Sequence, residues 1–263
     1  MNHVFAITNQ KGGVGKTTTC VNLAATMAAA KKRVLMIDLD PQGNATMGAG
    51  VNKNDVELSV NEVLVGEASI EQAAVTNEFK FDVLPANGDL TAAEVKLLAI
   101  DQREQQLRKA IEVVRPNYDY VFIDCPPSLN MLTVNALTAC DGVIIPMQCE
   151  YYALEGLSSL LSTIEQIQTY TNPELVIEGI LRTMYDPRSS LTTDVSAQLS
   201  EHFGGRLYRT VIPRNVRLAE APSHGMPVIA YDKQSKGAMA YMALAGEILR
   251  RHNATAESNA QAV

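Results

Sequence analysis

The segment NQKGGVGKTT, residues 9–18, lies between an apolar run at residues 3–8 and a helical pattern at residues 17–31. Its glycines lack a Cβ, so backbone N–H groups can turn toward one point, where the positive end of the helix dipole is also aimed. This order of strand, glycine-rich loop and helix predicts a phosphate-binding loop. The residues expected to bind phosphate are Lys11, Gly12, Gly13, Val14, Gly15, Lys16, Thr17 and Thr18.

Two lysines and a threonine give this loop its chemistry. Lys16 is expected to supply a cation to the β- and γ-phosphates of ATP, and the Thr17 hydroxyl to contact Mg²⁺. The standard pattern GxxxxGK[ST] requires glycine at position 10, where this chain has Gln10. A second lysine, Lys11, stands instead at the front of the loop. The loop therefore departs from the ordinary phosphate-loop pattern.

KGGVGKTT resembles the deviant Walker A motif of the ParA/MinD superfamily. The resemblance implies an ATPase that forms a homodimer around ATP and Mg²⁺. It also implies that Lys11 reaches across the dimer to the partner's phosphates, as an arginine finger does. On this basis Lys11 and Lys16 are both expected to be catalytic.

Acidic residues follow two further apolar runs. Asp38 and Asp40 lie in IDLDPQGNAT, and Asp124 is followed by CPPSLN. The carboxyl ends of strands are where ligands bind in open α/β sheets. The two stretches resemble switch I and switch II of the superfamily. The resemblance implies that Asp40 positions the attacking water, that Asp38 supports the Mg²⁺ shell or the switch, and that Asp124 holds Mg²⁺.

Apolar runs alternate with helical patterns along the chain, which predicts an α/β fold of the P-loop NTPase type. We expect a mainly parallel twisted sheet with helices on both faces. One domain is expected over residues 1–251, with a disordered tail at 252–263. Residues 44–80 carry a few short helical patterns and are the hardest part to assign. The expected strands are 3–8, 33–38, 81–86, 120–124, 142–148, 175–183 and 207–212. The expected helices are 17–31, 89–98, 102–115, 130–139, 151–170, 191–203 and 235–251.

The composition of the 263 residues is that of an ordinary globular protein, with a net charge of −7. No run of 18 apolar residues occurs, and the N-terminus has no secretory pattern, so a cytoplasmic location is expected. The net charge alone argues against a nucleic-acid partner. Residues 204–252, however, hold eight basic and three acidic residues, which is compatible with a basic patch on an acidic body.

Residues 211–241 resemble the chromosomal ParA/Soj branch of the superfamily. The resemblance implies a nucleoid-associated protein that binds DNA non-specifically as an ATP-loaded dimer, with a ParB-type centromere-binding partner. The tail lacks the basic amphipathic pattern of a membrane helix, so no membrane binding is expected. Candidates for DNA contact are Arg206, Arg209, Arg214, Arg217, Lys233, Lys236, Arg250 and Arg251.

Three residues are candidates for contact with adenine, because in the superfamily the base lies near the ends of later strands. These are Met184, Pro213 and Asn215. An alternative function also fits the sequence: a positioning ATPase for a membrane or protein assembly that does not bind DNA. The acidic net charge favours this alternative mildly.

Overall fold

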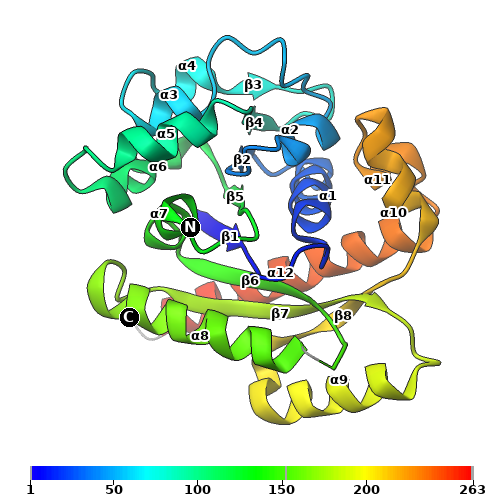
Figure 1. The fold of residues 1–263 in the computed structure, drawn as a ribbon. Coiled ribbons are helices and arrows are strands. Elements are labelled where there is room, and N and C mark those ends of the chain that lie inside the picture. Colours follow the sequence, from blue (N-terminus) through cyan, green and yellow to red (C-terminus); the bar gives the residue numbers. More distant parts are fainter. Residues whose placement is uncertain (1, 152, 262–263) are drawn as a thin grey trace.

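The computed structural model describes residues 2–151 and 153–261. Within them one sheet has the strand order β3-β4-β2-β5-β1-β6-β7-β8 (Figure 1). All neighbouring strands are parallel except β3, which runs antiparallel to β4. The strands are β1 His3–Ile7, β2 Val34–Asp38, β3 Val75–Thr76, β4 Asp82–Leu84, β5 Tyr120–Asp124, β6 Gly142–Gln148, β7 Val176–Tyr185 and β8 Leu207–Pro213. The expected mainly parallel α/β sheet is confirmed.

Helices cover both faces of the sheet. Those on the first face are α1 Lys16–Ala29, α2 Asn44–Gly48, α10 Val216–Glu220, α11 Val228–Tyr231 and α12 Lys236–Gln261. Those packed on the opposite face are α3 Val60–Leu64, α4 Ile70–Ala73, α5 Leu90–Leu97, α6 Gln106–Val114, α7 Met131–Ala139, α8 Ala153–Tyr170 and α9 Ser190–Phe203. Short 3₁₀ turns are η1 Arg103–Gln105, η2 Arg115–Asn117, η3 Gly204–Arg206 and η4 Ala221–His224.

The central strands separate two apolar cores. Successive residues of a strand point to opposite faces, so Val4 of β1 belongs to one core and Phe5 to the other. Because both faces are covered, the strands carry continuous apolar runs, and every residue of β2 and β5 is buried. Their parallel alignment brings the carboxyl ends of β1, β2 and β5 to one edge of the sheet.

Residues 44–80, where a few short helical patterns were hard to assign, contain α2, α3, α4 and β3. Each of these elements has five residues or fewer, too short for a periodic signal. The helix expected at 102–115 begins as α6 only at Gln106. Gln102 has φ of 53°, a left-handed conformation that interrupts a helix, and a 3₁₀ turn follows it.

Helix α12 extends to Gln261, ten residues beyond the expected end. His252, which the sequence assigned to a tail, packs against the sheet. Its ring stacks on His3 with centroids 4.0 Å apart, its Nε2 lies 3.3 Å from Glu178 Oε1, and its Nδ1 lies 3.1 Å from the Tyr120 hydroxyl. The domain boundary expected at residue 251 is therefore too early. Over residues 252–261 the expected disordered tail is instead the last part of α12, and residues 262–263 lie outside the described residues.

The stacked histidines predict a loss of stability in mild acid. Burial, and then the neighbouring His252, lowers the pKa of His3 to about 4. The unfolded chain, with a histidine pKa near 6.5, binds more protons than the folded chain between these values. Stability present above about pH 6.5 is therefore lost as the pH falls toward 4. Between pH 7 and pH 5 the Tm of wild type should fall roughly 2–4 °C more than that of His3→Gln. Parallel Tm profiles for the two proteins would contradict this assignment.

Candidate phosphate and metal site

The glycine-rich loop connects the end of β1 to the start of α1. Gly13 and Gly15 have φ of 74° and 89°, conformations that a side chain would strain. No side chain caps the N-terminus of α1, so its first N–H groups are left for a ligand. The loop is held in place by Asn9, whose Nδ2 donates to Pro146 O at 2.8 Å and whose Oδ1 accepts from Lys11 N at 3.0 Å.

Lys16 is almost fully buried at the start of α1, with 7% of its surface exposed. Its ammonium donates to Lys11 O at 3.1 Å, which folds the side chain back over the loop. Burial lowers the pKa of Lys16, while the charges of Asp124, Cys125 and Asp40 act to raise it. A buried cation is thus placed between the loop and the carboxylates that follow β2 and β5.

Lys11 lies on the outside of the same loop and is held by a weak contact. Its ammonium lies 2.6 Å from Glu150 Oε2, and both side chains are more than 40% exposed. An exposed pair of this kind contributes about 0–1 kcal/mol and is screened by salt. Lys11 is therefore easily released from Glu150 when a stronger anion is offered.

Asp38 and Asp124 end neighbouring strands in direct register, so their carboxylates are crowded together. Both residues are fully buried. Asp38 accepts three hydrogen bonds: from Thr46 N at 2.8 Å, from Thr46 Oγ1 at 2.7 Å and from Asp40 N at 3.0 Å. Burial raises the pKa of Asp38 to about 6, although these bonds act to lower it. Its position at the end of β2, bonded to Thr46 of α2, fits the expected support of the switch.

Asp124 has no such support, since neither carboxylate oxygen has a hydrogen-bond partner among the described residues. Burial, and then the charge of Asp38, raises its pKa well above the usual range; the Thr17 hydroxyl and Lys16 act in the opposite sense. A buried carboxylate without a partner is costly unless a cation joins it. Carboxylate and hydroxyl oxygens are the ligands that Mg²⁺ prefers, so Asp124 and Thr17 fit that ion.

Asp40 begins the loop after β2 and keeps one oxygen available. Its Oδ1 accepts from Gln42 N at 2.9 Å, and its Oδ2 has no hydrogen-bond partner among the residues described. Gly43 follows with φ of 63°, and a Cβ there would lie 2.6 Å from Ala86 O. Glycine is therefore required where this loop turns into α2.

The three candidates for adenine contact come together in one pocket of about 210 Å³. Met184 follows Thr183 on β7, while Pro213 and Asn215 come from the end of β8 and the cap of α10. Gly15 and Thr18 of the phosphate loop line the same pocket. The predicted base-contacting and phosphate-contacting residues are thus contiguous in space.

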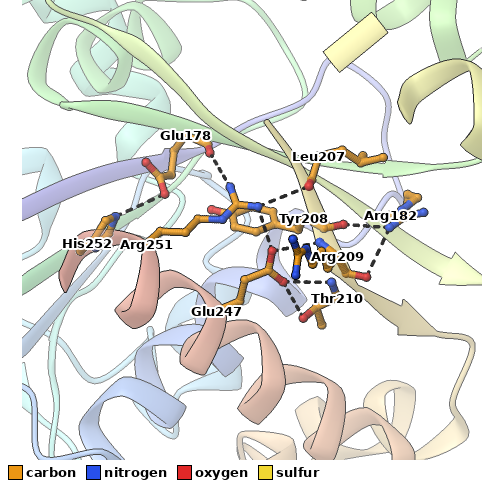
Figure 2. A network of polar contacts seen from close by, with 9 residues as sticks. All are labelled: Glu178, Arg182, Leu207, Tyr208, Arg209, Thr210, Glu247, Arg251 and His252. Carbon is orange, nitrogen blue, oxygen red and sulfur yellow. Dashed lines mark hydrogen bonds and ion pairs between the residues drawn. The ribbon is translucent and has the colours of Figure 1, made fainter. Parts of the chain in front are cut away.

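The basic candidates for DNA contact differ in exposure and in ion pairing. Arg251 is turned inward (Figure 2): its guanidinium lies 4.4 Å from the centre of the Tyr208 ring and bonds to Glu247, Leu207 O and Glu178 O. We therefore remove Arg251 from the DNA-contacting candidates. Arg217 is exposed but pairs with Glu220 and Asp232. The side chains that are exposed and form no ion pair within the described ranges are Arg206, Arg209, Arg214, Lys233, Lys236 and Arg250.

Sequence reasoning missed the residues that hold the loops in place. Thr46 bridges Asp38 to the chain after β4, because its hydroxyl also accepts from Ala86 N at 2.9 Å. Thr183 donates to Val14 O at 2.8 Å and ties β7 to the phosphate loop. Glu150 holds Lys11. Only Thr46 could have been singled out from the sequence, because it is the last residue of the DLDPQGNAT motif. Thr183 and Glu150 contact residues that are far away in the sequence.

Comparison with known proteins identifies relatives over nearly the whole chain. A family model described as an AAA domain matches residues 2–177. The chain is 54% identical over 249 residues to the sporulation initiation inhibitor protein Soj of Bacillus subtilis (strain 168), which covers 94% of this chain and 98% of that protein. It is 51% identical over 251 residues to the chromosome partitioning protein ParA of Caulobacter vibrioides (strain NA1000 / CB15N), covering 94% of each.

A solved structure with a different printed activity has the same fold. Cobyrinic acid a,c-diamide synthase from Mycobacterium smegmatis, with a bound ATP analog and magnesium, aligns with a TM-score of 0.85 and 38% identity. The alignment covers 96% of each chain. The fold thus accommodates nucleotide and magnesium, but it does not by itself select one activity.

The contrast between the two buried aspartates predicts opposite effects of removing their charge. Asp124→Asn removes a buried carboxyl whose ionisation is unfavourable, so without Mg²⁺ its Tm should rise by several degrees, at about 2–4 °C per kcal/mol. Asp38→Asn loses accepted hydrogen bonds and should lower the Tm. Mg²⁺ with ATP should raise the Tm of wild type but hardly that of Asp124→Asn. A less stable Asp124→Asn that still responds fully to Mg²⁺ and ATP would contradict the assignment.

Proposed function

The chain belongs to the ParA/Soj family of chromosome-partitioning ATPases, and we propose from this that it is an ATP-driven dimer that binds DNA and segregates it. The observation that best supports the proposal is the partnerless carboxylate of Asp124 beside Thr17 and Lys16. Burial and the neighbouring Asp38 make the ionised form of this carboxyl unfavourable, and a bound cation would stabilise it.

Each loop has a role in handling ATP. The glycine-rich loop and Lys16 bind the phosphates, and Met184, Pro213 and Asn215 contact the base. Thr17 and Asp124 hold Mg²⁺, which neutralises charge on the β- and γ-phosphates. Asp40 positions the attacking water through its free oxygen, while Asp38 holds the loop through Thr46.

Dimerisation completes the site through Lys11. Its contact with Glu150 is exposed and weak, so the phosphates of a partner's ATP, with several negative charges, compete for it effectively. A second cation near the γ-phosphate stabilises charge that develops during transfer. Hydrolysis is slow in the isolated dimer and is stimulated by a ParB-type protein.

The ATP-loaded dimer binds DNA through cations on the later elements of the fold. Their contacts are with phosphates, and are independent of sequence and sensitive to salt. ATP contacts the loops after β2 and β5 in one state only, and this differential contact shifts the population toward the DNA-binding dimer. The protein is then cytoplasmic and associates with the nucleoid.

The alternative is a positioning ATPase of the same family that does not bind DNA. The net charge of −7 favours it mildly. Among the described residues no helix has the length and apolar character to cross a bilayer. Gel retardation of DNA in the presence of ATP distinguishes the two functions.

Three substitutions test the nucleotide cycle. Lys16→Ala should lose ATP binding, because it removes the buried cation from the phosphates. Asp40→Ala should bind ATP and accumulate as a dimer, with hydrolysis reduced at least tenfold. Lys11→Ala should bind ATP, but it should not dimerise and should not hydrolyse the bound ATP. Nucleotide titration, light scattering and phosphate release measure the three properties. An active Asp40→Ala enzyme would exclude the proposed role of Asp40.

DNA binding is tested by gel retardation of an arbitrary plasmid across a salt series. Wild type should retard the plasmid with ATP but not with ADP, and affinity should fall steeply as salt rises. Arg217→Glu should weaken retardation while dimers persist. Absence of retardation with ATP at low salt would favour the positioning ATPase instead.

A further inference from the structure

Helix α5 turns an apolar stripe toward the solvent. Its inner face, which includes Leu90 and Leu97, is buried against the core. On its outer side Val95 is 68% exposed, and Leu98, the residue that follows the helix, is 58% exposed. Residues three apart are neighbours on a helix surface, so these two side chains form one stripe.

The stripe continues onto the loop that follows β5. Leu129 of this loop is 43% exposed. The next residue, Asn130, caps α7 and donates from its Nδ2 to Glu94 Oε2 of α5 at 3.1 Å. Glu94 lies one helical turn before Leu98 and therefore on the same side of α5. Leu129 is thus placed beside the stripe, and together with Val95 and Leu98 it forms an apolar patch.

The segment that leads into α5 contacts the loop after β2. It contains Ala86, whose N–H donates to Thr46 Oγ1 at 2.9 Å. Thr46 donates in turn to Asp38, and a Cβ on Gly43 would lie 2.6 Å from Ala86 O. A displacement of α5 would therefore reach both of the loops that surround the buried carboxyl groups of the nucleotide site.

The surroundings of the apolar patch are acidic. Residues 87–104 contain four acidic and two basic side chains. Asp89 and Asp101 lie at the two ends of α5 and are exposed. The ammonium of Lys96 lies 3.6 Å from Glu67 Oε1, so its charge is already balanced. The negative charge that remains favours a partner with basic residues beside its contact surface.

We propose that the apolar patch is the docking surface for the partner that stimulates ATP hydrolysis, and that this partner docks through an amphipathic helix with basic flanks. The inference rests on the proposed function, which includes such a partner. Apolar residues that are exposed together mark interaction sites. A helix fits best, because its apolar residues, three and four apart, can pack against the ridge formed by Val95 and Leu98. Contact with Leu129 then reaches the loop that follows Asp124.

The test compares Val95→Thr/Leu98→Gln with wild type in ATP hydrolysis, titrated with a purified ParB-type protein on plasmid DNA that carries its binding site. Half-maximal stimulation of the variant should require roughly tenfold more of the ParB-type protein, because a few central contacts carry most of the energy of an interface. Hydrolysis without that protein, ATP-dependent dimerisation and Tm should keep their wild-type values, because both side chains are exposed.

A second variant tests the basic character of the partner. Asp89→Asn/Asp101→Asn should also weaken stimulation, and the loss should be larger at low salt than at high salt, because salt screens exposed charges. Stimulation of this variant that equals wild type at low salt would overturn the basic flanks of the docking helix.

The matched control is Val113→Thr/Leu191→Gln, which makes the same two changes at exposed positions of α6 and α9 and should keep wild-type stimulation. If Val95→Thr/Leu98→Gln is stimulated like wild type, the docking surface is overturned while the proposed function stands. If that variant loses ATP-dependent dimerisation without the ParB-type protein, the patch is an interface between two copies of this chain, and the proposal also fails. If wild type hydrolyses ATP but is not stimulated by the ParB-type protein, the proposed partner and its docking surface fail together.

Discussion

The structure depends on a pair of buried carboxylates at one edge of its sheet. Parallel strands in register force Asp38 and Asp124 to the same place, and only Asp38 has hydrogen bonds to stabilise its charge. The fold thus crowds two carboxyl groups, whose ionised forms are unfavourable together, beside the cation Lys16. Such a site is unfavourable when empty and favourable when a metal and a phosphate chain fill it. The free energy of ligand binding therefore includes relief of this repulsion.

The hydrogen bonds of Asp38 connect the site to the rest of the molecule. Thr46 joins Asp38 to α2, and the turn after α2 touches the basic C-terminal segment through two glycines. A Cβ on Gly50 would lie 3.1 Å from Gly225 O, so the two backbones are in close contact. A movement of the loop after β2 would therefore displace the backbone around Gly225, between α10 and α11. This contact connects the loop that carries Asp40 to the segment that we propose binds DNA.

The sequence predicted the features that depend on neighbouring residues. β5 and β6 have the bounds expected from their apolar runs, and the glycine-rich loop connects β1 to α1 as expected. The capping box of Ser59 and Glu62 was a readable signal for α3. By contrast, α2 depends on the contact of its Thr46 with a distant strand. The inward turn of Arg251 depends on Tyr208 and Glu247, so charge patterns alone could not separate it from exposed arginines.

The irregular pairing of β8 has a consequence for crowding. At high local concentration, open sheet edges join one molecule to another. The pairing of β8 with β7 shifts register twice, and the opposite edge strand, β3, has only two residues. Irregular and very short edge strands are poor templates for a strand of another molecule. Molecules held close together can therefore remain separate instead of growing into fibrils.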